Sequence, residues 1–304
     1  IDIGCAGGID VTASANYTLT SNSSNFVKIE IKGLQGGHSG MDIHKGFGNS
    51  NVILGRLLYA GISDEIQLIS IDGGGLRNAI PREAHALVAV NNASEYLQKL
   101  ETLKSDILEE FASVEKDLEI NFATDENTEN GLSVEDSKKI ILALKSAHNG
   151  VYRMSPDVAD LVEASNNIAR VELKNGGLKI LNLTRSSVES TKMAVAEQLK
   201  SVFELAGMQV DFSGSYPGWK PKPGAEIIKI MTEIYEKDFG AKPHVVACHA
   251  GLECGIIGAN YPKMEMVSFG PTIRGAHSPD ERANIPSAQK FWKFVLEILA
   301  NIPV

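Results

Sequence analysis

The secondary structure expected for residues 13–212 repeats in order, and this repetition limits the possible folds more than any other feature of the sequence. Apolar residues alternate with polar ones in the expected strands and recur at helical spacing in the expected helices. The first half is predicted to run strand, helix, strand, strand, helix over residues 26–31, 49–60, 66–71, 84–90 and 95–111. The second half follows the same order over residues 117–123, 133–146, 168–173, 178–184 and 187–206. The sequence therefore predicts a doubled α+β domain, in which the order of elements repeats although the residues do not.

The composition of the sequence changes after this domain. Residues 213–224 contain three prolines and three glycines, which predicts a hinge. Beyond the hinge, the pattern predicts helices over residues 225–239, 251–257 and 287–301 and strands over residues 244–248 and 264–269. Alternation of this kind is typical of an α/β fold, in which a sheet is flanked by helices on both faces.

The composition excludes several classes of partner. A net charge of −9 argues against a nucleic-acid-binding surface. No uninterrupted apolar run reaches the ~18 residues that a membrane-spanning helix requires, and no secretory signal is visible after Ile1. The three cysteines show no pairing pattern, and the gap between Cys248 and Cys254 does not fit the usual zinc or redox spacing. We therefore expect a cytoplasmic protein whose cysteines are buried structural thiols.

Two histidines lie in loops of unusual composition. His277 follows the predicted strand 264–269, and Asp280 and Glu281 come shortly after it. A histidine at a strand end, with carboxylates that could orient its ring, is a usual arrangement for a metal ligand or a general base, although a solvated loop histidine is the more common case. His38 lies among glycines and has no apolar neighbours at strand or helix spacing. It is therefore either a site residue or part of an exposed loop.

Seven blocks of the chain, in the same order, resemble the zinc-dependent exopeptidases that include carnosinase-type dipeptidases, aminoacylases and tripeptidases. The blocks are residues 4–8, 33–51, 73–84, 155–157, 213–220, 248–254 and 270–285. Within this superfamily they are most similar to the Xaa-His dipeptidases. The length of the segment 13–212 favours this branch, because aminoacylases and deacetylases usually carry a shorter lid.

The resemblance implies that residues 1–12 and 213–304 are two pieces of an incomplete catalytic domain, and that residues 13–212 are inserted into it as a lid and dimerisation domain. It also implies two Zn²⁺ ions per intact subunit, which Mn²⁺ or Co²⁺ could replace, held mostly by an N-terminal half that this sequence does not contain. His277 is the one metal ligand of the family that the sequence includes. The implied hydrolysis of dipeptides therefore belongs to an intact homodimer, and this chain alone is expected to be inactive.

The resemblance also implies roles for four other residues. His38 would stabilise the oxyanion of the tetrahedral intermediate in the partner's active site, and Asn78 would bind the peptide backbone of the substrate. Arg185 would bind the C-terminal carboxylate of the substrate, and Glu253 would receive its α-ammonium group. From the residues alone, Asn78 is also explained as a turn residue and Arg185 as an exposed charge at a strand end. His249 fits either the core or the site.

Two other functions stay open at this point. The chain could belong to an N-acyl-amino-acid amidohydrolase or deacetylase of the same fold. It could instead be a non-catalytic body that associates with itself through the lid. Activity on N-acyl amino acids but not on dipeptides would favour the first of these alternatives over the dipeptidase hypothesis.

Overall fold

The computed structural model describes residues 1–22, 25–63, 65–126, 130–274 and 281–301. Its main sheet is built from β2 (Gly7–Asn16), β3 (Phe26–Lys32), β5 (Gln67–Gly74), β7 (Ala84–Ala89), β8 (Glu119–Asp125), β9 (Gly150–Met154), β10 (Val162–Lys174), β11 (Gly177–Ser186) and β12 (Gln209–Tyr216). The helices that accompany this sheet are α1 (Ser50–Ala60), α2 (Ala93–Phe111), α3 (Val134–Ser146) and α4 (Glu189–Leu205). These helices agree with the predicted ones to within about two residues at each end, a difference that fraying and capping explain.

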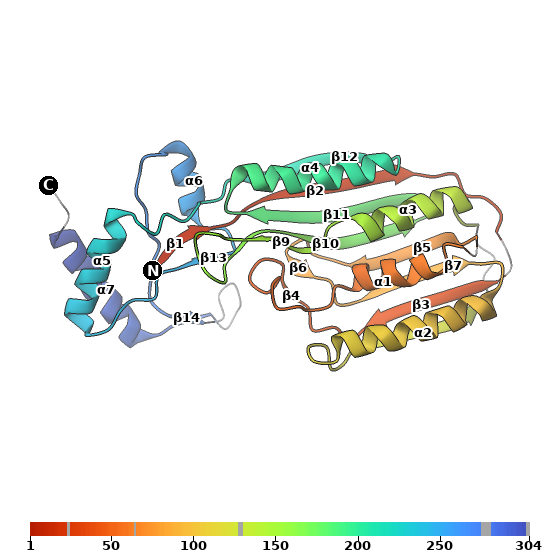
Figure 1. Ribbon diagram of the computed structural model, residues 1–304, viewed down its shortest axis with the longest axis horizontal. Coiled ribbons are helices and arrows are strands. Elements are labelled where there is room, and N and C mark those ends of the chain that lie inside the picture. The colour runs from red at the N-terminus through yellow and green to blue at the C-terminus, as the bar shows by residue number, and fades with distance from the viewer. Residues whose placement is uncertain (23–24, 64, 127–129, 275–280, 302–304) are drawn as a thin grey trace.

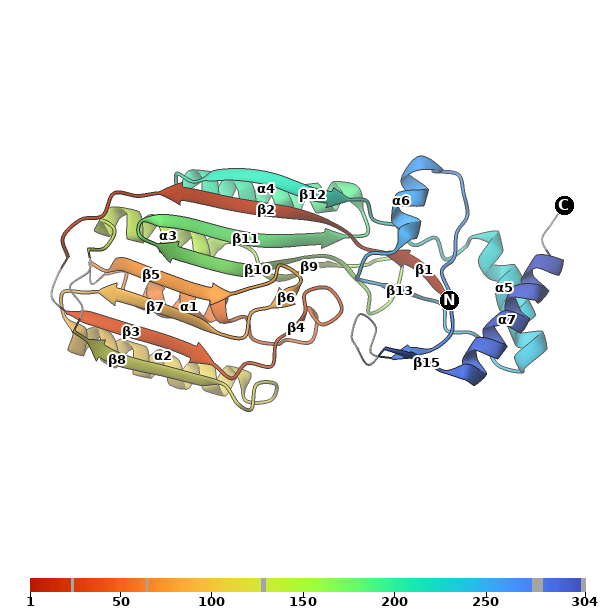
Figure 2. The ribbon, with the colours of Figure 1, turned by 180° about the vertical axis from the view of Figure 1, so that it is seen from behind.

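The nine strands pair in an antiparallel sheet in the order β12-β2-β11-β10-β5-β7-β3-β8, with β9 beside β10. Helices α1 to α4 lie on one face of this sheet (Figure 1). In the described part of the chain, no helix covers the opposite face (Figure 2). Aliphatic and aromatic side chains fill the layer between helices and sheet. Leu54 and Leu57 of α1 and Leu199 and Phe203 of α4 are at most 1% exposed.

The sheet consists of two halves that meet where β5 pairs with β10. One half contains β3, α1, β5, β7, α2 and β8 in chain order, and the other contains β2, α3, β10, β11, α4 and β12. The repeated order of elements is therefore present. The prediction that residues 117–123 open the second half is wrong, because β8 pairs with β3 at the edge of the first half. The second half uses β2 in that place, so that the first half is inserted between β2 and α3.

A smaller unit lies beside one end of this sheet (Figure 1). Its strands β1 (Asp2–Cys5) and β13 (Val246–Cys248) pair in parallel, and β14 (Ile273–Arg274) pairs with β15 (Arg282–Ala283). Its helices are α5 (Glu226–Phe239), α6 (Glu253–Asn260) and α7 (Ile285–Ala300). Met231, Ile234 and Phe294 form the buried centre of a cluster between α5 and α7. The overall class is thus mixed α/β, as predicted.

Two local predictions for this unit are wrong. Residues 264–269 do not form a strand, since only Ser268 is bridged, to Asp2. The predicted hinge begins inside β12, which continues through Tyr216. In both cases the backbone partner decides the outcome. β2 continues the pairing of β12, whereas the run 264–269 meets β1 only at the bridge between Ser268 and Asp2. No helix in the described ranges is both long and apolar enough to cross a membrane.

Candidate active site

The loop that carries His38 connects β3 to α1 and is closed at both ends by one carboxylate. Glu115, which is 5% exposed, accepts hydrogen bonds from the backbone N–H groups of Gln35 and Gly48, both at 2.7 Å. A carboxylate that accepts two backbone N–H bonds gains strong, charge-assisted hydrogen bonds that offset its burial. The loop is therefore anchored rather than loose. Sequence reasoning missed Glu115, because its position after α2 carries no signal that it reaches back to this loop.

The geometry of His38 defines which of its ring nitrogens carries hydrogen. β4 (Gly37–His38) pairs with β6 (Ala79–Ile80), and the backbone N–H of His38 donates to Asp42 Oδ2 at 2.7 Å. The ring Nδ1 accepts hydrogen bonds from the N–H groups of Gly40 and Met41 at 3.1 and 3.0 Å. Since Nδ1 is an acceptor, the neutral ring carries its hydrogen on Nε2.

The charge state of His38 follows from its surroundings. Burial lowers the pKa of His38, and the positive charge of Arg185 lowers it further, while Asp42 acts in the opposite direction. The imidazole is therefore neutral at physiological pH. His38 consequently presents one N–H donor, at Nε2, which is the group that a developing oxyanion requires.

Asn78 lies directly beside His38. The N–H of Ser39 donates to the carbonyl of Asn78 at 2.8 Å, and the β4–β6 pairing places His38 opposite Ala79. Asn167 of β10 holds this turn in place. Its Nδ2 donates to the carbonyls of Arg77 and Ala79, on either side of Asn78, at 3.1 and 2.8 Å. The exposed side-chain amide of Asn78 makes no hydrogen bond with the described residues. It is therefore available to a ligand.

Arg185 is held near the end of β11 by the β10–β11 hairpin, whose turn contains Asn175 and Gly176 with φ values of 51° and 79°. Positive φ at both positions is the geometry expected for Asn-Gly in a tight hairpin, as predicted. Arg185 is opposite Ser165 on β10 and Gly8 on β2. The alternative of an exposed charge at a strand end is wrong, because Arg185 is only 5% exposed.

The guanidinium of Arg185 has no counterion among the residues that the structure describes. Its Nη1 donates to the hydroxyl of Tyr216 at 2.9 Å, and its Nε lies 3.4 Å from Ser39 Oγ. Within the described residues, no carboxylate forms an ion pair with it. Burial of an unpaired charge costs several kcal/mol, so a buried guanidinium of this kind is usually compensated by an anion. The arrangement thus favours binding of a carboxylate or a similar group.

His249, which follows β13, completes this cluster. It is 5% exposed, and its Nε2 lies 2.8 Å from the hydroxyl of Ser165. Burial, and then the charge of Arg185, lower the pKa of His249 to about 3, although the carbonyl of Val162 acts in the opposite direction. A Cβ at Gly40 would lie 2.1 Å from the His249 carbonyl oxygen, so the loop of His38 packs directly against this segment. His249 therefore belongs to the site rather than to the apolar core.

The structure brings His38, Asn78 and Arg185 together from three distant parts of the chain. The strands β4 and β6 lie toward the end of the sheet that faces the smaller unit (Figures 1 and 2). The structure does not bring Glu253 to these three residues. Glu253 is exposed in the first turn of α6 and makes no ion pair with a described residue. His277 lies outside the described residues.

The described residues do not by themselves fit a metal centre. Among them, no three His, Cys, Asp or Glu side chains gather as a ligand set. The cysteines are free thiols, and burial raises the pKa of Cys5 to about 11, which disfavours the thiolate that would bind zinc.

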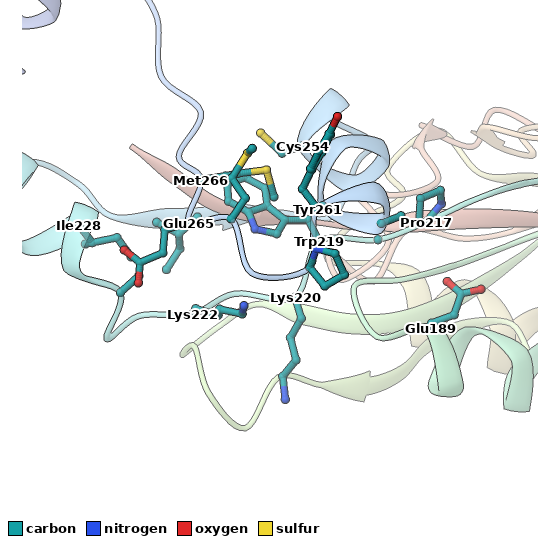
Figure 3. Close-up of a pocket in the computed structure, with 17 residues that line it drawn as sticks. Glu189, Pro217, Trp219, Lys220, Lys222, Ile228, Cys254, Tyr261, Glu265 and Met266 are labelled. Atoms are coloured by element: carbon teal, nitrogen blue, oxygen red, sulfur yellow. The ribbon is translucent and has the colours of Figure 1, made fainter. Parts of the chain in front are cut away.

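A separate pocket lies between α6 and the segment after β12 (Figure 3). Trp219, Tyr261 and Met266 give it a largely apolar lining, with Lys220 and Glu265 at its rim. His38, Asn78, Arg185 and Glu253 are absent from its lining. The cluster of His38, Asn78 and Arg185 and this pocket are thus different features of the molecule.

Comparison with known proteins shows what the chain is similar to. Residues 29–119 match the peptidase dimerisation domain. The chain is 40% identical over its whole length to the cytosol non-specific dipeptidase of Escherichia coli strain K12, of which it covers 64%. The structure of aminoacylhistidine dipeptidase from Vibrio alginolyticus matches with a TM-score of 0.94 and 39% identity, over 99% of this chain and 63% of that one. The chain spans just under two thirds of the length of each relative. Residues 29–119 are therefore similar to a peptidase dimerisation domain, and the whole chain is similar to part of each of these two dipeptidases.

Proposed function

We propose that this chain is the lid and the C-terminal part of a metal-dependent dipeptidase that hydrolyses unblocked dipeptides, Xaa-His dipeptides among them. The observation that carries the proposal is the buried guanidinium of Arg185, which has no acidic partner among the described residues and lies beside the neutral His38. A dipeptidase has to recognise a free C-terminal carboxylate close to the scissile bond. A buried cation next to a hydrogen-bond donor meets that requirement.

In this proposal, each of the three residues binds a different part of the substrate. Arg185 binds the C-terminal carboxylate, and the free amide of Asn78 hydrogen bonds to the peptide backbone. His38 Nε2–H donates to the oxygen of the scissile carbonyl as negative charge develops on it. A donor placed in this way lowers the barrier by about 3 kcal/mol in other hydrolases. Glu253 is proposed as the receiver of the α-ammonium group, and its exposure means that a movement or a substrate would have to complete that contact.

The metal belongs to the proposal as well. Relationship to metallopeptidases supports a requirement for divalent ions, with Zn²⁺ as the proposed metal, Mn²⁺ or Co²⁺ as substitutes, and His277 as this chain's ligand. The metal would supply activation of the attacking water. Residues 1–12 and 213–304 are then parts of the catalytic domain, and residues 13–212 are the lid. The exposure of Ile285 (73%) and Trp292 (60%) on α7 supports a further piece of protein over this face.

We further propose that His38 and Arg185 act in one site and come from the same chain. Ser39, the neighbour of His38, contacts Arg185 of the same chain, and the two residues come from opposite halves of the doubled sheet. One chain thus supplies both members of the pair. The match to a dimerisation domain supports a homodimer, but the pairing of His38 with Arg185 does not depend on it. Cytoplasm is the proposed location, as the name of the curated relative states for that protein.

Turnover assays on the complete protein, that is, this chain together with the segment that carries the other metal ligands, test the function. We expect zinc-dependent hydrolysis of glycyl-histidine and none of N-acetyl-histidine. Replacement of His38 by Ala should lower kcat about 100-fold or more with little change in KM. Hydrolysis of N-acetyl-histidine alone would instead establish the amidohydrolase alternative. A complete, zinc-loaded protein without turnover of either compound would establish a non-catalytic role.

A further inference from the structure

Three of the glycine-containing blocks that the sequence singles out converge on one side chain, Tyr216. A Cβ at Gly8 would lie 2.6 Å from the Tyr216 hydroxyl oxygen, and a Cβ at Gly251 would lie 3.2 Å from its ring. Gly7 is equally constrained, since its Cβ would lie 2.5 Å from the Tyr216 carbonyl oxygen. Residues 4–8, 213–220 and 248–254 therefore form one packed unit around this tyrosine.

The backbone of Tyr216 is held by a buried lysine. Lys192 of α4 has 0% exposure, and its Nζ donates to the Tyr216 carbonyl at 2.9 Å and to Ser215 Oγ at 3.1 Å. Glu189 provides its counterion at 3.0 Å. A buried ammonium with three partners fixes the strand end far more firmly than a solvated one would. The aromatic ring thus has little freedom to leave Arg185.

Within the described ranges of the chain, the hydrogen of the Tyr216 hydroxyl is not donated to any acceptor. A phenol has one hydrogen to donate and lone pairs that accept. Tyr216 Oη accepts from Arg185 Nη1 at 2.9 Å, and its own O–H has no acceptor among the described residues. Two neighbouring groups, the guanidinium and the phenol, therefore both present donors. A carboxylate, which has two acceptor oxygens and a negative charge, can satisfy both donors at once.

We propose that the Tyr216 hydroxyl is a binding residue that donates a hydrogen bond to the substrate's C-terminal carboxylate, beside Arg185. The inference rests on the proposed dipeptidase function and extends its substrate site. In this account, one carboxylate oxygen binds the guanidinium and the other binds the phenol. The tyrosine then helps to distinguish a free C-terminus from a blocked or extended one.

The test is Tyr216→Phe in the complete protein. This change keeps the ring that packs against Gly8 and Gly251 and removes only the hydroxyl. With glycyl-histidine, kcat/KM should fall about 10- to 100-fold, mainly through KM, because a hydrogen bond to a charged group is lost. With glycyl-histidinamide, which has no carboxylate, kcat/KM should change less than about 2-fold. Tyr59→Phe, on the exposed side of α1 at 42% exposure, is the matched control and should leave both values unchanged.

Equal losses on both substrates would overturn the inference, because they would mean that Tyr216 only positions Arg185 or the fold. No change on either would overturn it as well. If the wild-type protein hydrolyses no dipeptide, the proposed function fails, but calorimetric titration with the same two compounds still tests Tyr216. A preference for the acid over the amide that disappears in Tyr216→Phe would support the inference, and its absence in the wild type would overturn it.

Discussion

Acidification should weaken this protein through His249 in a way that one substitution can isolate. Burial and the charge of Arg185 lower the pKa of His249 from 6.5 to about 3. In the unfolded chain, the His249 imidazole therefore binds a proton near pH 6.5. In the folded chain, it binds that proton only when the pH approaches 3. Because the unfolded state binds more protons, stability is full above pH 6.5 and falls as the pH decreases through this window.

The magnitude follows from the two pKa values. At pH 5 the unfolded imidazole is almost fully protonated and the folded one is not, so His249 costs about 2 kcal/mol of unfolding free energy relative to pH 8. Below pH 3 the cost approaches about 5 kcal/mol. The pKa of His148 is also lowered by burial, so the whole protein should lose more than this amount.

Denaturant unfolding of the wild type and of His249→Gln at pH 8 and pH 5 measures the effect. Glutamine can keep a hydrogen bond to Ser165, which lies 2.8 Å from His249 Nε2, and it does not titrate. The difference in stability between pH 8 and pH 5 should shrink by about 2 kcal/mol in the variant. His85→Gln is the control, because the His85 side chain is 41% exposed. An identical pH dependence in wild type and His249→Gln would refute the assignment of His249 as a buried neutral imidazole.

Three further predictions follow from the same contacts. Glu115→Ala leaves the backbone N–H groups of Gln35 and Gly48 without their acceptor, so denaturation should show a loss of about 2 kcal/mol, and turnover should fall with it. Gly8→Ala would place a Cβ 2.6 Å from the Tyr216 hydroxyl oxygen, so KM for dipeptides should rise; an unchanged KM would contradict this packing. Mixtures of inactive His38→Ala and Arg185→Ala chains should stay inactive after refolding together, and recovery of up to about a quarter of the activity would mean that His38 serves the partner subunit instead.

The fold could be predicted where the information is local. The helix at residues 49–60 follows from apolar spacing and the Asn175 hairpin from residues that tolerate positive φ, and the structure confirms both. The predictions that are wrong concern which strands pair with each other. The strand at residues 117–123 exists, but its neighbour is β3 because the first half of the sheet is inserted into the second. Residues 264–269 are apolar without a strand to pair with along their length.

The residues of the candidate site also fall into two groups, those that the sequence identifies and those that only the structure identifies. His38, Asn78 and Arg185 were accessible through motifs that resemble known enzymes, and the structure brings these residues together. Glu115 and Tyr216 were not accessible, because a buried carboxylate that closes a distant loop and a phenol beside a guanidinium leave no local pattern. Their roles exist only once the sheet has joined its two halves to the smaller unit. Their positions are properties of the tertiary structure.

Arg185 is a buried charge that we propose binds a substrate carboxylate. Arg185→Met tests this claim most directly, when unfolding free energy and kcat/KM are measured on the same preparation of the complete protein. We predict that kcat/KM for glycyl-histidine falls about 100-fold or more, while the stability of the ligand-free protein stays equal or rises, because an unpaired charge has been removed from the interior. A loss of several kcal/mol of stability with retained kcat/KM per folded molecule would contradict the claim and make Arg185 a structural residue.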